Sequence, residues 1–104
     1  MGDHLLADVD SIASGSAKRF DIEGVRLAVA RVDDTFYALA DRCSHEDFSL
    51  SLGEVFTDTC EIECARHGAT FDLLTGAAMC FPATVGVAVY PVNVVEGKIV
   101  VTLP

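Results

Sequence analysis

The sequence is short of basic residues. Seven Lys and Arg oppose sixteen Asp and Glu, which gives the 104-residue chain a formal net charge of −9. This charge repels nucleic acid and anionic lipid surfaces, so we expect neither a nucleic acid nor a membrane as a partner. Protein partners with basic docking faces are the expected alternative, although a solvated surface that keeps a small hydrophobic domain soluble also explains the acidity.

The sequence also lacks a long uninterrupted apolar run, although 51% of its residues are hydrophobic. Gly86, Pro91 and a charged turn at 96–98 interrupt the longest apolar region, which falls short of the roughly 20 residues that a membrane span needs. The first ten residues have no basic segment leading into an apolar stretch, which predicts a cytoplasmic protein with reduced thiols. Four cysteines then indicate metal ligands or buried thiols rather than disulfides.

Convincing helical periodicity, internal repeats and low-complexity tracts are absent as well. Runs rich in Val, Ile, Thr and aromatic residues alternate with turn signals, which is typical of an antiparallel all-β domain. We predict hairpins from 17–22 with 25–32 and from 90–95 with 98–104, and a further strand at 35–40. The expected core residues of these strands are Val25, Leu27, Val29, Val92, Val94, Ile99 and Val101.

The whole chain, 1–104, is predicted to be one domain. Its fold class is an antiparallel β-sandwich or barrel, formed by about residues 1–40 and 84–104. A more irregular subdomain at about residues 41–83 is inserted into it, and within this insert the stretch 41–72 holds three of the four cysteines and two of the three histidines, in two short clusters.

Each cluster follows a predicted strand, as Cys43-x-His45 and as Cys64-x-x-His67. Thiolates and neutral imidazoles are the donors that hold iron or zinc, whereas carboxylates suit Mg²⁺ or Ca²⁺. Either motif alone is weak, but the pair predicts one metal site. A structural Zn²⁺ in a Cys₂His₂ site fits the donor set, but Cys-x-His is tighter than the usual zinc knuckle and no helix follows to carry the second pair.

These two motifs, separated by eighteen residues and followed by Gly68, resemble the cluster-binding signature of Rieske iron–sulfur proteins. The continuation "HGATFD", the loop "TGAAMCFPAT" and the closing "VGVAVYPVNVVEGKIVV" extend the resemblance over most of the chain. It implies a Rieske-like fold with one [2Fe-2S] cluster, in which Cys43 and Cys64 bind one iron and His45 and His67 bind the other. Neutral imidazoles in place of two thiolates raise the reduction potential into a span of roughly −150 to +300 mV.

Three positions indicate the low end of this span. High-potential members of the family have a disulfide between the two ligand loops and a serine that donates a hydrogen bond to a bridging sulfide. Phe48 and Arg66 stand where those cysteines would be, and Ala69 stands where that serine would be. With fewer hydrogen-bond donors near the cluster, its reduced, more negative form is stabilised less, and the reduction potential is lower.

The resemblance is greatest to the ferredoxin components of ring-hydroxylating dioxygenase systems. It implies a soluble one-electron carrier, not itself an enzyme, between an NADH-linked flavin reductase and a terminal non-haem iron oxygenase. A monomer is the simplest expectation for a carrier that docks with two proteins in turn. The stretch "CSHEDFSLSLGEV" with "IEC" also resembles small Rieske proteins found with iron–sulfur assembly genes, so a redox-sensing or assembly accessory module is the alternative.

Other residues have simpler expected roles. Cys60 is expected to be a packed thiol, and Cys80 a small hydrophobic residue in the loop that covers the cluster, which Pro82 shapes. Phe71 is expected in the core, and His4 is expected to be exposed at an unanchored end.

Acidic residues around the motifs are expected to form either a docking rim or a solvated face. They are Glu46, Asp47, Glu54, Asp58, Glu61 and Glu63. Gly53 and Gly76 are expected in turns, and Gly68 where the backbone approaches the cluster.

Overall fold

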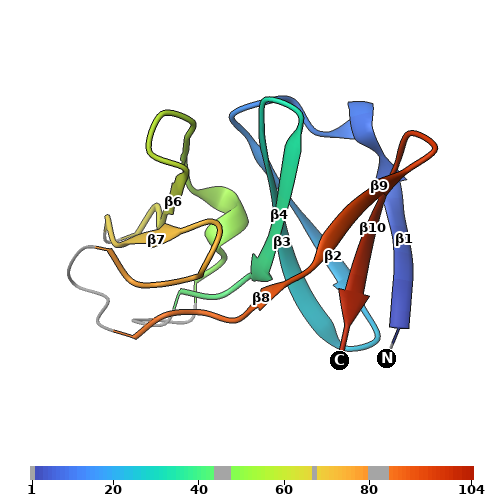
Figure 1. The fold of residues 1–104 in the computed structure, drawn as a ribbon. Helices are drawn as coiled ribbons and strands as arrows, with labels where there is room; N and C mark the ends of the chain where they lie inside the picture. The colour runs from blue at the N-terminus through green and yellow to red at the C-terminus, as the bar shows by residue number, and fades with distance from the viewer. Residues whose placement is uncertain (1, 44–47, 67, 80–84) are drawn as a thin grey trace.

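The computed structural model describes residues 2–43, 48–66, 68–79 and 85–104. Their strands form three antiparallel sheets, so the all-β prediction is confirmed (Figure 1). The strands are β1 (Gly2–Asp8), β2 (Ala17–Ile22), β3 (Val25–Val32), β4 (Thr35–Ala40), β5 (Val55–Phe56), β6 (Glu61–Glu63), β7 (Thr70–Asp72), β8 (Val89–Tyr90), β9 (Val92–Val95) and β10 (Lys98–Leu103). The described part also has two 3₁₀ helices, η1 (Val9–Ser11) and η2 (Leu50–Leu52), and none of its helices is long and apolar enough to cross a membrane.

The three sheets follow one another across the molecule. Strands β2, β3, β4 and β8 form the middle sheet, with the β1-β10-β9 sheet on one side and the β5-β6-β7 sheet on the other (Figure 1). The predicted hairpin of β2 and β3 is confirmed, with Ile22 opposite Val25. Its two turn residues, Glu23 and Gly24, both have positive φ angles of 49° and 81°, as a tight hairpin turn requires.

Strand β3 contributes to two hydrophobic cores, because successive side chains of a strand point to opposite faces. Leu27 and Val29 belong to the first, which we call the terminal core, and Ala28 and Ala30 to the second, which we call the insert core; all four are fully buried. The shared face of Leu27 and Val29 was predicted, but the burial of the opposite face was not.

The terminal core joins the middle sheet to the β1-β10-β9 sheet, and the insert core joins it to the β5-β6-β7 sheet. The terminal core consists of Ile12, Leu27, Val29, Phe36, Ala38, Ile99, Val101 and Leu103. The insert core consists of Ala28, Ala30, Leu39, Cys43, Leu50, Val55, Ile62, Cys64, Ala69, Phe71 and Leu73. The prediction that Phe71 is a core residue is therefore confirmed, and two of the predicted metal ligands lie in the same core.

The C-terminal hairpin differs from its prediction at Pro91. A single strand was expected over 90–95. Instead, Tyr90 pairs with Ala38 in the middle sheet, whereas Val92 pairs with Val101 in the β1-β10-β9 sheet, which we call the terminal sheet. Proline has no N–H to donate to a ladder, and here it lies where the chain passes from one sheet to the next.

Two further expectations are corrected at the terminal sheet. Val94 was expected in the core but is 49% exposed, although it pairs with the fully buried Ile99, because β9 is the edge strand of its sheet. His4 was expected to be exposed at an unanchored end, but it lies in β1 opposite Val101 and is half-buried. The first residues are anchored because β1 pairs with β10 along almost its whole length.

A matched pair of substitutions tests the assignment of the C-terminal hairpin. Val101→Ala removes two buried methyl groups and should lower the free energy of unfolding by about 2 kcal/mol. Val94→Ala should change it by less than about 0.5 kcal/mol, because the side chain is half exposed. Urea titration at matched cluster content measures both, and equal losses would contradict the assignment.

Candidate metal centre

Each of the two predicted cysteine ligands begins a loop that is closed by a backbone hydrogen bond of the same span. The Cys43 N–H donates to the carbonyl of Phe48 at 2.9 Å, and the Cys64 N–H donates to the carbonyl of Ala69 at 2.7 Å. Both bonds join residues five positions apart. The second loop has an additional bond, from the Gly68 N–H to the Cys64 carbonyl at 2.9 Å. The two loops are therefore closed by equivalent bonds between described residues, and each contains one of the predicted histidines in its sequence.

Both cysteines are buried in the insert core, with 1% of Cys43 and none of Cys64 exposed. The other two predicted ligands, His45 and His67, lie outside the described residues. Within residues 2–43, 48–66, 68–79 and 85–104, no group of three or more His, Cys, Asp or Glu side chains is arranged to hold a metal ion. The described residues thus supply the thiol half of the predicted ligand set, from two loops that share one core.

The segments that flank the two loops are in direct backbone contact. Gly53, just after η2, has no room for a side chain, since an added Cβ would lie 1.6 Å from the carbonyl oxygen of Glu63. Next to this contact, the Glu63 N–H donates to the Glu54 carbonyl at 2.8 Å. Because Glu63 directly precedes Cys64, the contact ties the end of the first loop region to the start of the second.

Gly53 and Gly76 were expected in turns and Gly68 at a close backbone approach, and the structure shows a different constraint at each of the three. Gly53 has an ordinary φ of −88°, so close contact requires glycine there. Gly68 has a φ of +76° and the nearest atom to an added Cβ is 3.8 Å away, so backbone conformation is what favours glycine there. Gly76 meets both conditions, with a φ of +77° and only 2.1 Å between an added Cβ and the Val87 carbonyl oxygen.

The residues expected to set a low potential are apolar or exposed. Ala69 is fully buried in the insert core and has no side-chain donor. Phe48 packs against the same core, and Arg66 is exposed. The described side chains at these three positions are therefore consistent with few hydrogen bonds to the sulfur atoms of a cluster.

Cys60 lies in a turn before β6 and not in the strand. Its φ is +58°, and its side chain is partly buried against the insert core. A hydrogen bond with the Cys60 thiol, together with burial, raises the pKa of Tyr37 above its usual range. This contact agrees with the predicted role of a packed thiol, whereas Cys80 and Pro82 lie outside the described residues.

Four of the six acidic residues of the predicted rim can be placed. Glu54 and Asp58 are exposed, and Glu61 and Glu63, on β6, are half-buried. Glu46 and Asp47 lie outside the described residues. Sequence reasoning overlooked another acidic residue, Asp41, which is fully buried just before Cys43; its only sequence signal was its position at the end of a strand.

The Rieske [2Fe-2S] domain family matches residues 3–91. The chain belongs to this family. The cofactor of a Rieske domain is one [2Fe-2S] cluster, and two buried thiols in matched loops fit the thiolate half of its ligation. Membership decides against the structural zinc site, and the predicted family and fold are confirmed.

Rieske ferredoxins of dioxygenases are among the most similar known proteins. The 3-phenylpropionate/cinnamic acid dioxygenase ferredoxin subunit of Escherichia coli (strain K12) is 43% identical over 96 residues, which cover 92% of this chain and 89% of that protein. The ferredoxin of carbazole 1,9a-dioxygenase from Nocardioides aromaticivorans IC177 has a TM-score of 0.96 at 32% identity, over 100% of both chains. A chain in a complex of reduced oxygenase and oxidized ferredoxin in carbazole 1,9a-dioxygenase has a TM-score of 0.89 at 36% identity, over 96% of this chain and 92% of that chain.

Gly53→Ala tests the contact between the two loop regions. The added methyl group overlaps the Glu63 carbonyl, so we expect a loss of about 3 kcal/mol or more in the free energy of unfolding and a lower iron content. Gly97→Ala is the control, since its φ is positive but no atom lies within 4 Å of an added Cβ, and it should cost about 1 kcal/mol. Urea titration and iron analysis measure both effects, and a well-folded, fully loaded Gly53→Ala protein would contradict the contact.

Proposed function

We propose that Cys43 and Cys64 bind one iron of the cluster and that His45 and His67 bind the other. The observation that carries this assignment is the burial of both cysteines in one core, at the starts of two loops closed by equivalent hydrogen bonds. A buried thiolate is costly unless it is paired or bound to a metal, and a cluster supplies that compensation. The division of the chain into a basal part, 1–40 and 84–104, and a cluster-binding part, 41–83, belongs to the same proposal.

The function that these features support is one-electron transfer to a terminal oxygenase. When bound, a [2Fe-2S] cluster accepts and releases single electrons. The chain contributes the ligands, an apolar core that keeps water from the two cysteines, and loops that hold the site in one geometry. It is a carrier component and not an enzyme, as the names of its ferredoxin relatives indicate.

The proposed route begins at an NADH-linked flavin reductase and ends at a non-haem iron oxygenase. The similarity to a ferredoxin in complex with an oxygenase supports the second partner, and the dioxygenase subunits among the relatives favour this route over an accessory role in iron–sulfur assembly. Exposed Glu54 and Asp58 supply acidic charge that a basic docking face would complement. A cytoplasmic monomer suits alternate docking with two proteins.

Replacing a ligand tests the assignment directly. Cys43→Ser, Cys64→Ser or His67→Ala should each abolish the visible absorption and the EPR signal of the reduced cluster, and with them electron transfer from a flavin reductase to an oxygenase. Cys60→Ser is the matched control, because Cys60 packs against the same core without beginning a ligand loop, and it should keep both properties. A Cys43→Ser protein with an unchanged cluster and unchanged electron transfer would refute the assignment.

Ala69→Ser tests the origin of the low potential. A hydroxyl group at this buried position can donate to a cluster sulfur, and a net gain of about 1 kcal/mol in the reduced state would raise the potential by about 40 mV. Ala17→Ser is the control, since Ala17 packs against the same core from β2 in the middle sheet. Redox titration followed by EPR measures both, and an equal shift in the two variants would exclude a specific hydrogen bond.

A further inference from the structure

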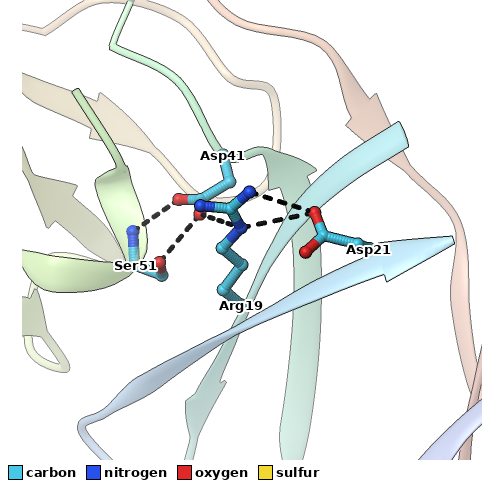
Figure 2. A network of polar contacts seen from close by, with 4 residues as sticks. All are labelled: Arg19, Asp21, Asp41 and Ser51. Atoms are coloured by element: carbon cyan, nitrogen blue, oxygen red, sulfur yellow. Dashed lines mark hydrogen bonds and ion pairs between the residues drawn. The ribbon is translucent and has the colours of Figure 1, made fainter. Parts of the chain in front are cut away.

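Asp41 is the one charged side chain that is fully buried among the residues that the structure describes. Ser51 contacts both of its carboxylate oxygens: the backbone N–H donates to Oδ1 at 2.7 Å, and the hydroxyl donates to Oδ2 at 2.9 Å. The Arg19 Nε lies 3.8 Å from Oδ2. Figure 2 shows Asp41 held between Ser51 on one side and the Arg19 guanidinium on the other. A buried carboxylate needs such partners, because burial without them is costly.

These contacts involve residues on both sides of the Cys43 loop in the sequence. Asp41 lies two residues before Cys43, and Ser51 lies in η2, three residues after Phe48. The side-chain bonds between Asp41 and Ser51 therefore form a second closure outside the backbone bond that joins Cys43 to Phe48. Arg19 comes from β2, so the same carboxylate also connects the loop to the middle sheet (Figure 2).

The charges of the network formed by Arg19, Asp21 and Asp41 do not cancel. The Arg19 Nε and Nη2 also lie 3.3 Å from Oδ1 of Asp21, whose side chain is 59% exposed. One guanidinium thus faces two carboxylates, and the three side chains together keep one negative charge. Solvent screens the Asp21 carboxylate, whereas the Asp41 carboxylate is shielded from water and acts on nearby charges more strongly.

We propose that Asp41 is a positioning residue for the Cys43 loop, and that its buried charge, partly offset by Arg19, lowers the reduction potential of the cluster. Reduction adds a negative charge to the cluster, so a fixed negative charge beside a ligand loop opposes it. The proposal rests on the proposed ligand role of Cys43. It adds an electrostatic cause of low potential to the lack of a donor at Ala69.

Two substitutions should shift the potential in opposite directions. Asp41→Asn keeps the shape and an oxygen that can accept from the Ser51 N–H, but it removes the negative charge, so the potential should rise. Arg19→Gln removes the compensating positive charge and leaves Asp41 in place, so the potential should fall. Protein-film voltammetry of the loaded proteins measures the shifts, together with iron content and the EPR g-values as readouts of loop geometry.

Controls separate the local charge from the net charge. Lys18→Gln removes a positive charge from the neighbouring position of β2, whose side chain points to the opposite face. Asp34→Asn removes a fully exposed negative charge that pairs with Arg31. Both controls should leave the potential close to that of the wild type. Ser51→Ala keeps every charge but loses one of the two bonds to Asp41, and it should lose iron to a chelator faster than the wild type.

The outcomes distinguish this proposal from the function on which it rests. Shifts of opposite sign that exceed those of both controls support it. Shifts of the same sign, or shifts no larger than those of the controls, overturn the electrostatic role, even where the wild type carries its cluster and transfers electrons. If Asp41→Asn does not load, the fall expected for Arg19→Gln and the faster iron loss of Ser51→Ala still decide, and their absence refutes the proposal. A wild type without a cluster would instead refute the proposed function.

Discussion

Strand β3 is buried on both faces, and both hydrophobic cores of the molecule pack against it. Of the four buried side chains of β3, the larger two, Leu27 and Val29, face the terminal core, whereas the small Ala28 and Ala30 face the insert core. Small side chains let the second core approach the sheet closely. The strand therefore links the sheet made by the chain's ends to the region that holds the two cysteines, and a change in the register of β3 would exchange the two faces.

The described residues between β4 and β8 have little regular structure, and backbone contacts hold them together. Strands β5, β6 and β7 have two or three residues each, which gives few ladder bonds. The equivalent closures of the Cys43 and Cys64 loops and the contact of Gly53 with Glu63 supply additional constraints. A redox centre benefits from such a framework, because an electron carrier works best when its ligands keep one geometry in both oxidation states.

Charge is distributed in two ways around this framework. Exposed acidic residues such as Glu54 and Asp58 are screened by solvent and suit the attraction of a basic partner at a distance. Asp41 is shielded from solvent and is held by Ser51 and Arg19, so its influence is local. The same net acidity can thus serve docking on the surface and the tuning of the potential inside, since burial determines how far each charge is screened.

The family, the all-β class and the first hairpin could all be predicted from the amino-acid sequence. Ligand spacing and flanking motifs are local patterns, and the turn at Glu23 and Gly24 is encoded by two adjacent residues. The folded structure was needed to establish that Ala28 and Ala30 are buried, that Val94 is half exposed, and that the chain changes sheets at Pro91. It also decided the pairing of Asp41 with Arg19 and Ser51, which are 22 and 10 residues away along the chain. Such contacts depend on which distant segments cover a face, and a periodic pattern within one strand carries no information about that.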